Sequence, residues 1–332
     1  MSRIILPEPE LLAIAVSGQD RLALANALNL LDDRRPDVRK CAATFLDALL
    51  VHQPESIGHL IGITGPPGVG KSSLTSALIK VWRKRGFRVA VLAVDPSSQI
   101  SSGALLGDRL RMHDSGTDTD VFIRSLACRG ESGGLSAEVW PMSMVMLAAF
   151  DIVLVETVGI GQKEIDVSKM TDTTCFVVQP ASGDSIQFLK AGIMEVPHVI
   201  VVNKEDIGVS ALKTLSELQN SLRRQTDKEG WQVQALSVSA VLCNGIESLA
   251  DLLDSHRLWL LENGKFAAHR QRCQSEWLVK HLREEFGNYG IGLLGGEDAI
   301  SQCLAASAPR RSPISEYESI RDLTIHAMKI KN

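Results

Sequence analysis

Residues 65 to 72 read Gly-Pro-Pro-Gly-Val-Gly-Lys-Ser, and this stretch decides the fold. It lies between an apolar run at 60–64 and a helix-compatible stretch that begins at Ser73. A strand that turns sharply into a helix directs several unpaired backbone N–H groups to one point, where the helix dipole also favours an anion. The sequence therefore predicts a phosphate-binding loop, and the alternative is a Gly-rich turn that arose by chance.

Residue type assigns a role to each position of this loop. Glycines keep side chains away from the cluster of amides. We expect Lys71 to reach the β and γ phosphates of a nucleoside triphosphate, and the Ser72 hydroxyl to ligate the Mg²⁺ that bridges them. The predicted phosphate-binding set is Gly65, Gly68, Val69, Gly70, Lys71, Ser72 and Ser73.

Short apolar runs alternate with longer amphipathic segments from Gly58 to about Leu261. The runs that we expect to form strands are 60–64, 88–94, 151–155, 174–178, 198–202 and 233–238. This alternation is typical of an α/β protein, because the crossovers of a parallel sheet carry helices. The sequence therefore predicts a P-loop NTPase fold, with a mostly parallel sheet, helices on both faces, and the ligand at the carboxyl ends of the strands.

A second motif, Asn203-Lys204-Glu205-Asp206, follows the apolar run 198–202. An aspartate at the end of a strand can accept hydrogen bonds from N1 and N2 of guanine, and adenine has no such pair of donors. We expect Asn203 to contact the base edge and the Lys204 stem to pack on the ring. Ser239 and Ala240 come after a later strand and could supply backbone contacts to the base. The motif favours GTP or GDP as the ligand; an exposed turn is the alternative.

Acidic residues at predicted strand ends are candidates for the magnesium and catalytic groups. Glu156 and Gly159 follow the buried run 151–155, and we expect Glu156 to act on Mg²⁺ or its water and the Gly159 amide to bond the γ phosphate. Asp95 and Asp108 could also supply hard oxygen ligands. The alternatives are a surface charge for Glu156, and a helix cap or turn residue for each aspartate. The predicted catalytic set is Lys71, Asp95, Asp108 and Glu156, and the predicted metal set is Ser72, Asp95, Asp108 and Glu156.

Helical periodicity flanks this central region on both sides. Residues 8–50 are expected to form two packed helices joined at 32–36, and a long helix through Trp277 should precede a Gly-rich break and a last helix pair. The predicted organisation is an N-terminal helical extension at 1–56, a P-loop GTPase domain at 57–262, and a C-terminal helical extension at 263–332 that mediates dimerisation.

The composition of this chain of 332 residues argues against several classes of function. The net charge of −4 argues against a broad nucleic-acid surface. Six scattered cysteines without a Cys-x-x-Cys pair argue for a reducing compartment, so we expect a cytoplasmic protein without a zinc or redox site. We find neither an export signal nor an apolar run of about 18 residues, and expect no membrane association.

Several long motifs in one order resemble the MeaB, ArgK and MMAA family of P-loop GTPases. They are GPPGVGKS, VLAVDPSS, LGDRLRM, DIVLVETVGIGQ and NKED. The resemblance covers nearly the whole chain and implies a metallochaperone that gates cofactor loading of an adenosylcobalamin-dependent acyl-CoA mutase and protects or reactivates it. It implies that mutase as a partner, with an adenosyltransferase as a second candidate, and a homodimer. It also implies a mobile segment at 181–192 that responds to the mutase.

The chain departs from this family pattern at three places. Ser102-Gly-Ala replaces the usual Gly-Gly-Ser, Ala191 replaces one of two lysines, and the loop 129–134 differs. A mutase other than the methylmalonyl-CoA enzyme is therefore a plausible partner.

The predicted mechanism is a switch with slow intrinsic hydrolysis that a partner stimulates. GTP and Mg²⁺ would order loops 95–115, 156–165 and 181–192. Arg109, Arg111 and Arg124 are candidates for an arginine finger or for structural ion pairs.

Two other functions remain open at this point. A small-molecule kinase would use the same loop to phosphorylate an acceptor such as an amino acid. A nickel-insertion GTPase would share the fold, but Val196-Pro197-His198 lacks the cysteine of a Cys-Pro-His motif and no His-rich tract is present.

Overall fold

The computed structural model describes residues 6–52, 58–96, 118–128, 135–157, 163–180, 197–222, 226–227, 229–306 and 311–331. The chain divides into two compact units. The first unit combines 1–58, 137–150 and 270–332, and the second combines 59–136 and 151–269. The predicted domain boundaries near residues 57 and 262 stay predictions.

The second unit is built on a seven-stranded sheet in the order β3-β2-β4-β1-β5-β6-β7. Every pairing in it is parallel, which confirms the predicted fold class. The strands are β1 (His59–Thr64), β2 (Val89–Pro96), β3 (Val121–Cys128), β4 (Ile152–Thr157), β5 (Thr173–Val178), β6 (Val199–Val202) and β7 (Gln234–Ser237). Six of them match the predicted apolar runs. The edge strand β3 was not predicted, because Arg124 and Ser125 interrupt its apolar pattern.

Alternation along the strands divides the core of this unit between two faces of the sheet. Cys175 and Val177 of β5 pack in a cluster with helices α4 (Lys71–Lys84) and α10 (Ile246–Glu262). Phe176 and Val178, one residue out of phase, pack instead with helix α9 (Val209–Leu222). Helices therefore cover both faces, and strands buried on both sides read as continuous apolar runs.

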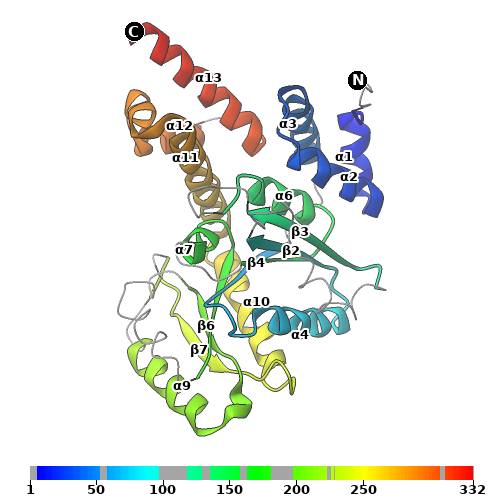
Figure 1. The fold of residues 1–332 in the computed structure, drawn as a ribbon, viewed down its shortest axis with the longest axis vertical. Coiled ribbons are helices and arrows are strands. Elements are labelled where there is room, and N and C mark those ends of the chain that lie inside the picture. The colour runs from blue at the N-terminus through cyan, green and yellow to red at the C-terminus, as the bar shows by residue number, and fades with distance from the viewer. Residues whose placement is uncertain are drawn as a thin grey trace. The chain divides into compact units, whose positions relative to one another are not determined.

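Helix α7 (Lys163–Ser168) approaches the sheet closely at Gly62 of β1. A Cβ at Gly62 would lie 2.9 Å from Val167 Cγ2 and 2.9 Å from Thr171 Oγ1, so this position needs glycine for space. The short 3₁₀ helix η3 (Glu205–Ile207) follows β6. Figure 1 shows how α4, α9 and α10 lie along the strands.

The first unit is helical. Its elements are α1 (Pro9–Ser17), α2 (Arg21–Asp32), α3 (Pro36–Val51), α6 (Val139–Leu147), α12 (Glu297–Ala306) and α13 (Pro313–Lys331). Helix α11 (Phe266–Leu293) begins in the second unit and continues into the first, with a non-helical Gly287 inside it. The expectation of two helices in 8–50 was wrong, because three form there. Gln19 adopts a φ of 67°, and the Asp20 carboxylate caps α2 by accepting from the Ala23 amide at 2.8 Å.

Polar contacts tie the parts of the first unit together. The Asp47 carboxylate of α3 accepts from the Ser312 amide at 2.8 Å and from the Ser315 hydroxyl at 2.6 Å. The Trp277 indole donates to the Ala137 carbonyl at 3.0 Å. The start of α13 is thereby fixed to α3, because the Asp47 carboxylate accepts from residues just before and within the first turn of α13.

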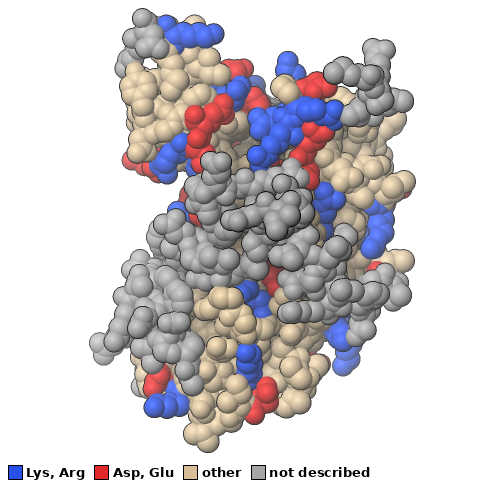
Figure 2. Space-filling model, in the orientation of Figure 1, with Lys and Arg blue, Asp and Glu red and all other residues tan. Residues whose placement is uncertain are grey.

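Among the helices of the described residues, none has both the length and the apolar character that crossing a bilayer requires. Over the face shown in Figure 2, the basic and acidic side chains of the described residues are interspersed.

Candidate functional site

The loop between β1 and α4 owes its shape to three glycines with positive φ. Gly65 has a φ of 141°, and a Cβ there would lie 2.1 Å from the Val177 carbonyl oxygen. Gly70 has a φ of 90°, and a Cβ there would lie 2.6 Å from Asn203 Nδ2. Gly68 has a φ of 77° with open space around its Cβ position, so conformation alone demands glycine there. The loop can therefore approach its neighbours and present backbone amides, as a phosphate cradle requires.

Lys71 is the first residue of α4 and is 7% exposed. Its ammonium donates to the carbonyl oxygens of Gly65 at 2.8 Å and Pro66 at 2.9 Å. The positive charge thus lies over the loop at the positive end of the helix dipole. This combination of charge and amides fits the phosphates of a nucleotide.

Asn203 joins three loops at the carboxyl edge of the sheet. It follows β6 and is 2% exposed. Its Nδ2 donates to the Val69 carbonyl oxygen at 2.9 Å, and its Oδ1 accepts from the Ala240 amide at 3.1 Å. The phosphate loop, the segment after β6 and the segment after β7 are therefore held together by one amide side chain.

Lys204 has a φ of 64°, a conformation that is uncommon for a residue with a side chain. Its ammonium donates to the Gly68 carbonyl oxygen at 2.8 Å and to Gln179 Oε1 at 2.8 Å. These two acceptors fix the ammonium end of the stem, which can then serve as a flat apolar support for a base.

Asp206 is exposed, and its Oδ1 accepts from the Ser239 hydroxyl at 2.6 Å. The Ser239 oxygen in turn accepts from the Leu242 amide at 3.2 Å. A carboxylate oriented in this way is an acceptor that suits two N–H donors on one edge of a base.

Glu156 lies near the end of β4 and is 6% exposed. Its Oε1 accepts from the Ser72 hydroxyl at 2.6 Å, and its Oε2 accepts from the Thr75 hydroxyl at 2.8 Å. A carboxylate and a hydroxyl at the mouth of a phosphate loop are hard oxygen donors, which is the chemistry that Mg²⁺ prefers. Ser72 and Glu156 therefore fit the predicted cation, although their role as its ligands stays a prediction.

Several predicted site residues lie outside the described residues. Asp95 pairs with Ala127 in the register of β2 and β3, but its side chain is not described. Asp108, Gly159, Arg109 and Arg111 fall in segments without description, as do 129–134 and 181–192. Arg124 lies within β3, in register with Leu92.

Two residues at the site were not predicted from the sequence. Thr75 lies one turn into α4 behind Ser72, and Gln179 follows β5. A polar residue directly after a buried strand was the available signal for Gln179. Thr75 gave no signal, because a threonine within a helix usually bonds to its own backbone.

A second group of polar side chains lies at the opposite, amino edge of the sheet. His59 begins β1, Thr173 begins β5, and His198 precedes β6. The Thr173 hydroxyl bonds to His59 Nε2 at 2.7 Å and to His256 Nδ1 at 2.8 Å. Burial lowers the pKa of His59 and of His256 below the usual value for histidine, so both rings are neutral at pH 7.

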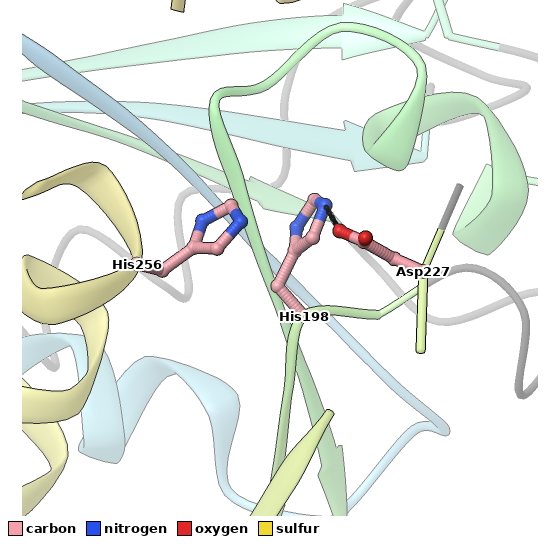
Figure 3. Close-up of side chains that lie close together, drawn as sticks. All are labelled: His198, Asp227 and His256. Atoms are coloured by element: carbon pink, nitrogen blue, oxygen red, sulfur yellow. Dashed lines mark ion pairs between the residues drawn. The ribbon is translucent and has the colours of Figure 1, made fainter. Parts of the chain in front are cut away.

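His198, Asp227 and His256 lie close enough together to suggest a metal site, with candidate ligand atoms within 4.8 Å of one another (Figure 3). Two observations argue against one. The rings of His198 and His256 are stacked, with centroids 4.1 Å apart and planes 22° apart, so their in-plane lone pairs do not converge on one ion. His198 Nδ1 also accepts the Thr174 amide at 2.8 Å, which places the ring proton on Nε2, facing Asp227 Oδ2 at 3.6 Å. His198 and His256 therefore form a stacked pair of rings, with the Asp227 carboxylate facing His198.

The parallel sheet, the glycine-shaped loop before α4, and the Asn203 and Asp206 groups beside it define a P-loop nucleotide-binding protein. Residues 24–289 match the family described as methylmalonyl Co-A mutase-associated GTPase MeaB. The chain belongs to this family of GTPases, as its motifs predicted.

Named relatives agree with the family. GTPase ArgK of Escherichia coli is 34% identical over 285 residues, which cover 84% of each chain. The mouse protein named methylmalonic aciduria type A homolog, mitochondrial, is 32% identical over 81% of this chain and 68% of its own length. The crystal structure of LAO/AO transport system kinase superimposes with a TM-score of 0.67 at 25% identity, over 97% of this chain and 99% of that one.

Proposed function

We propose that this protein binds GTP and hydrolyses it to GDP and phosphate, and that it uses this cycle as a chaperone of an adenosylcobalamin-dependent acyl-CoA mutase. The observation that carries the first part is the bond from Asn203 Nδ2 to the Val69 carbonyl oxygen at 2.9 Å. It joins the segment that carries Asp206 directly to the phosphate loop. Groups for both ends of a guanine nucleotide therefore lie within one connected structure.

Each group has a defined task in this proposal. Backbone amides and Lys71 hold the phosphates, because they supply positive charge and donors at a helix N-terminus. Asp206 accepts from guanine, the Lys204 stem supports the ring, and Glu156 orients the Ser72 hydroxyl. When bound, Mg²⁺ would supply positive charge to stabilise the phosphates. We assign the remaining predicted acids, Asp95 and Asp108, to the same centre on sequence alone.

The mutase partner is proposed from the family. The family description links these GTPases with methylmalonyl-CoA mutase, and the mouse relative is named for methylmalonic aciduria. We propose that hydrolysis is slow in the protein alone and is stimulated by the mutase. A homodimer, an adenosyltransferase as second partner, and a cytoplasmic location complete the proposal. The departures at Ser102 and Ala191 leave the identity of the acyl-CoA substrate open.

Calorimetry and turnover together test this function. Purified protein with Mg²⁺ should bind GTP and GDP and should prefer them over ATP and ADP. Phosphate release from GTP should rise by orders of magnitude when the matching cobalamin mutase is added, since a partner that completes such a site has an effect of that size. Equal affinity for GTP and ATP would contradict the guanine assignment. Turnover that no cobalamin mutase changes would remove the chaperone role alone.

The kinase alternative predicts a different product. Incubation with labelled GTP or ATP and added amino acids should give labelled free phosphate if the protein is a switch, and a phosphorylated amino acid if it is a kinase. The names ArgK and LAO/AO transport system kinase make this comparison worth running in the same assay.

A further inference from the structure

The Glu156 carboxylate is held at both of its oxygens by hydroxyl groups of one helix. Ser72 and Thr75 are three residues apart on α4, so they share one face of it. Their hydroxyls lie 2.6 Å from Oε1 and 2.8 Å from Oε2 of Glu156. Thr75 is fully buried, and Glu156 is 6% exposed. The orientation of this carboxylate is therefore set by the same helix whose N-terminus forms the phosphate cradle.

Thr75 differs from other threonines in helices of this chain. Three other helical threonines each donate their hydroxyl to the carbonyl oxygen four residues earlier. The distances are 3.1 Å for Thr44, 3.0 Å for Thr214 and 2.8 Å for Thr324. That bond is the usual choice for a threonine within a helix. The Thr75 hydroxyl donates to Glu156 instead. The bond from Thr75 to Glu156 therefore does not serve to complete the helix that contains Thr75.

The number of donors and acceptors on each group determines how the Ser72 hydroxyl is oriented. An ionised carboxylate only accepts, so the single proton of the Ser72 hydroxyl points to Glu156 Oε1. The lone pairs of Ser72 Oγ are then left for a hard cation. This holds only while Oε1 stays in place, and rotation of the carboxylate would move it. The bond from Thr75 to Oε2 opposes that rotation.

We propose that Thr75 is a positioning residue for the cation site: it fixes Glu156, and through Glu156 it fixes the direction of the Ser72 lone pairs. This inference rests on the proposed function, since it concerns the Mg²⁺ that accompanies the nucleotide. It assigns Thr75 no contact with nucleotide or metal. Its effect should therefore appear in the response to Mg²⁺ and not in the Mg²⁺-free affinity for nucleotide.

The test measures the release rate of a fluorescent GDP analogue in Mg²⁺ and in EDTA. We expect Mg²⁺ to slow release from the wild-type protein. Thr75→Val keeps the side-chain shape but removes the donor, and it should reduce the slowing by Mg²⁺ by about tenfold, the usual effect of one hydrogen bond to a charged group. Its release rate in EDTA should stay within about twofold of wild type. Thr75→Ser keeps the hydroxyl and should restore the Mg²⁺ response.

Thr324→Val is the matched control, because Thr324 is also buried and bonds only to its own helix carbonyl among the described residues. It should lower the thermal midpoint without altering the response to Mg²⁺. If Thr75→Val unfolds at the assay temperature, Thr75→Cys takes its place as a small side chain with a weak donor. A Mg²⁺ response equal to wild type in the variant that folds would overturn the role of Thr75. A wild-type protein that binds neither GDP nor GTP would overturn the proposed function instead.

Discussion

Asn203 Nδ2 lies 2.9 Å from the carbonyl oxygen of Val69, so the residue that opens the base-reading motif also supports the phosphate loop. Asn203 is 2% exposed, and its Oδ1 accepts from the Ala240 amide. A buried amide with two such bonds shapes the loop before any base is bound. It therefore has a structural task beyond the contact with guanine that its motif predicts.

Replacing Asn203 tests this double task. Asn203→Ala should weaken binding of GDP and also of inorganic tripolyphosphate, each by roughly tenfold to a hundredfold, because it removes the buried bond that supports the phosphate loop and the bond to the Ala240 amide. Calorimetry with both ligands measures the effect. Asn263→Ala is the control, since Asn263 bonds to the Trp259 carbonyl at an exposed helix end. An Asn203→Ala variant that loses GDP but keeps tripolyphosphate would limit Asn203 to base recognition.

Asp206 should determine the choice of base. Asp206→Asn gives the side chain a donor, so it should favour xanthine, which carries a carbonyl oxygen where guanine has an amino group. We expect GDP affinity to fall by about tenfold to a hundredfold and XDP affinity to rise, in line with the value of hydrogen bonds to a charged group. Competition binding with GDP, XDP and ADP measures the change. The neighbouring Glu205→Gln is the control and should leave the preference for guanine intact, because Glu205 faces Ser237.

Gln179 should matter for affinity but not for the choice of base. Gln179→Leu removes one of the two acceptors that hold the Lys204 ammonium. Since the Lys204 stem supports any purine, affinities for GDP and IDP should fall together by about fivefold, the value of roughly 1 kcal/mol for one such bond. Gln179→Glu keeps an acceptor in place and should bind at least as well as wild type. A change in the ratio of GDP to IDP affinity would show that Gln179 reads the base.

Acid should destabilise the second unit through its buried histidines. His59 and His256 have lowered pKa values because burial disfavours the charged ring. The unfolded chain takes up these protons near pH 6.5 and the folded chain does not, so the stabilisation is complete above that pH and is lost as the pH falls below it. The free energy of unfolding should therefore fall as the pH drops below 6.5.

Urea unfolding at pH 7.5, 6.5 and 5.5 measures this dependence. His256→Gln removes one titrating ring and should flatten the curve, whereas His326→Gln, on an exposed residue, should not. Burial raises the pKa of Asp227, so protonation of this carboxyl as the pH falls adds an effect of opposite sign. A curve as steep in His256→Gln as in wild type would contradict this role of His256.

The sequence predicted the sheet and the phosphate loop well, because both depend on local patterns. Buried parallel strands read as apolar runs, and the loop needs glycines at fixed positions. Prediction failed at two places where the apolar pattern alone does not decide the structure. The edge strand β3 carries Arg124 within it, and the break between α1 and α2 depends on the local cap at Asp20.

The functional site shows the same difference between what local patterns reveal and what only contacts reveal. Lys71, Glu156 and Asn203 could be selected from motifs, since each stands at the end of a predicted strand or the start of a helix. Their partners could not be selected in this way. Thr75 and Gln179 act through contacts between segments 81 and 25 residues apart in the chain, which a one-dimensional pattern does not contain.

Helix α10 begins directly after Gly245, at the end of the turn that holds Ser239 and Ala240, and it carries His256 ten residues after its first residue, beside the Thr173 hydroxyl. Its 17 residues form a rod of about 25 Å that runs from one margin of the sheet to the other. If the stacked rings of His198 and His256 separate, α10 can shift, and the turn that precedes it beside the base would shift with it. A substitution in the imidazole stack should consequently be detectable as a change in the rate of nucleotide exchange, before any unfolding is seen.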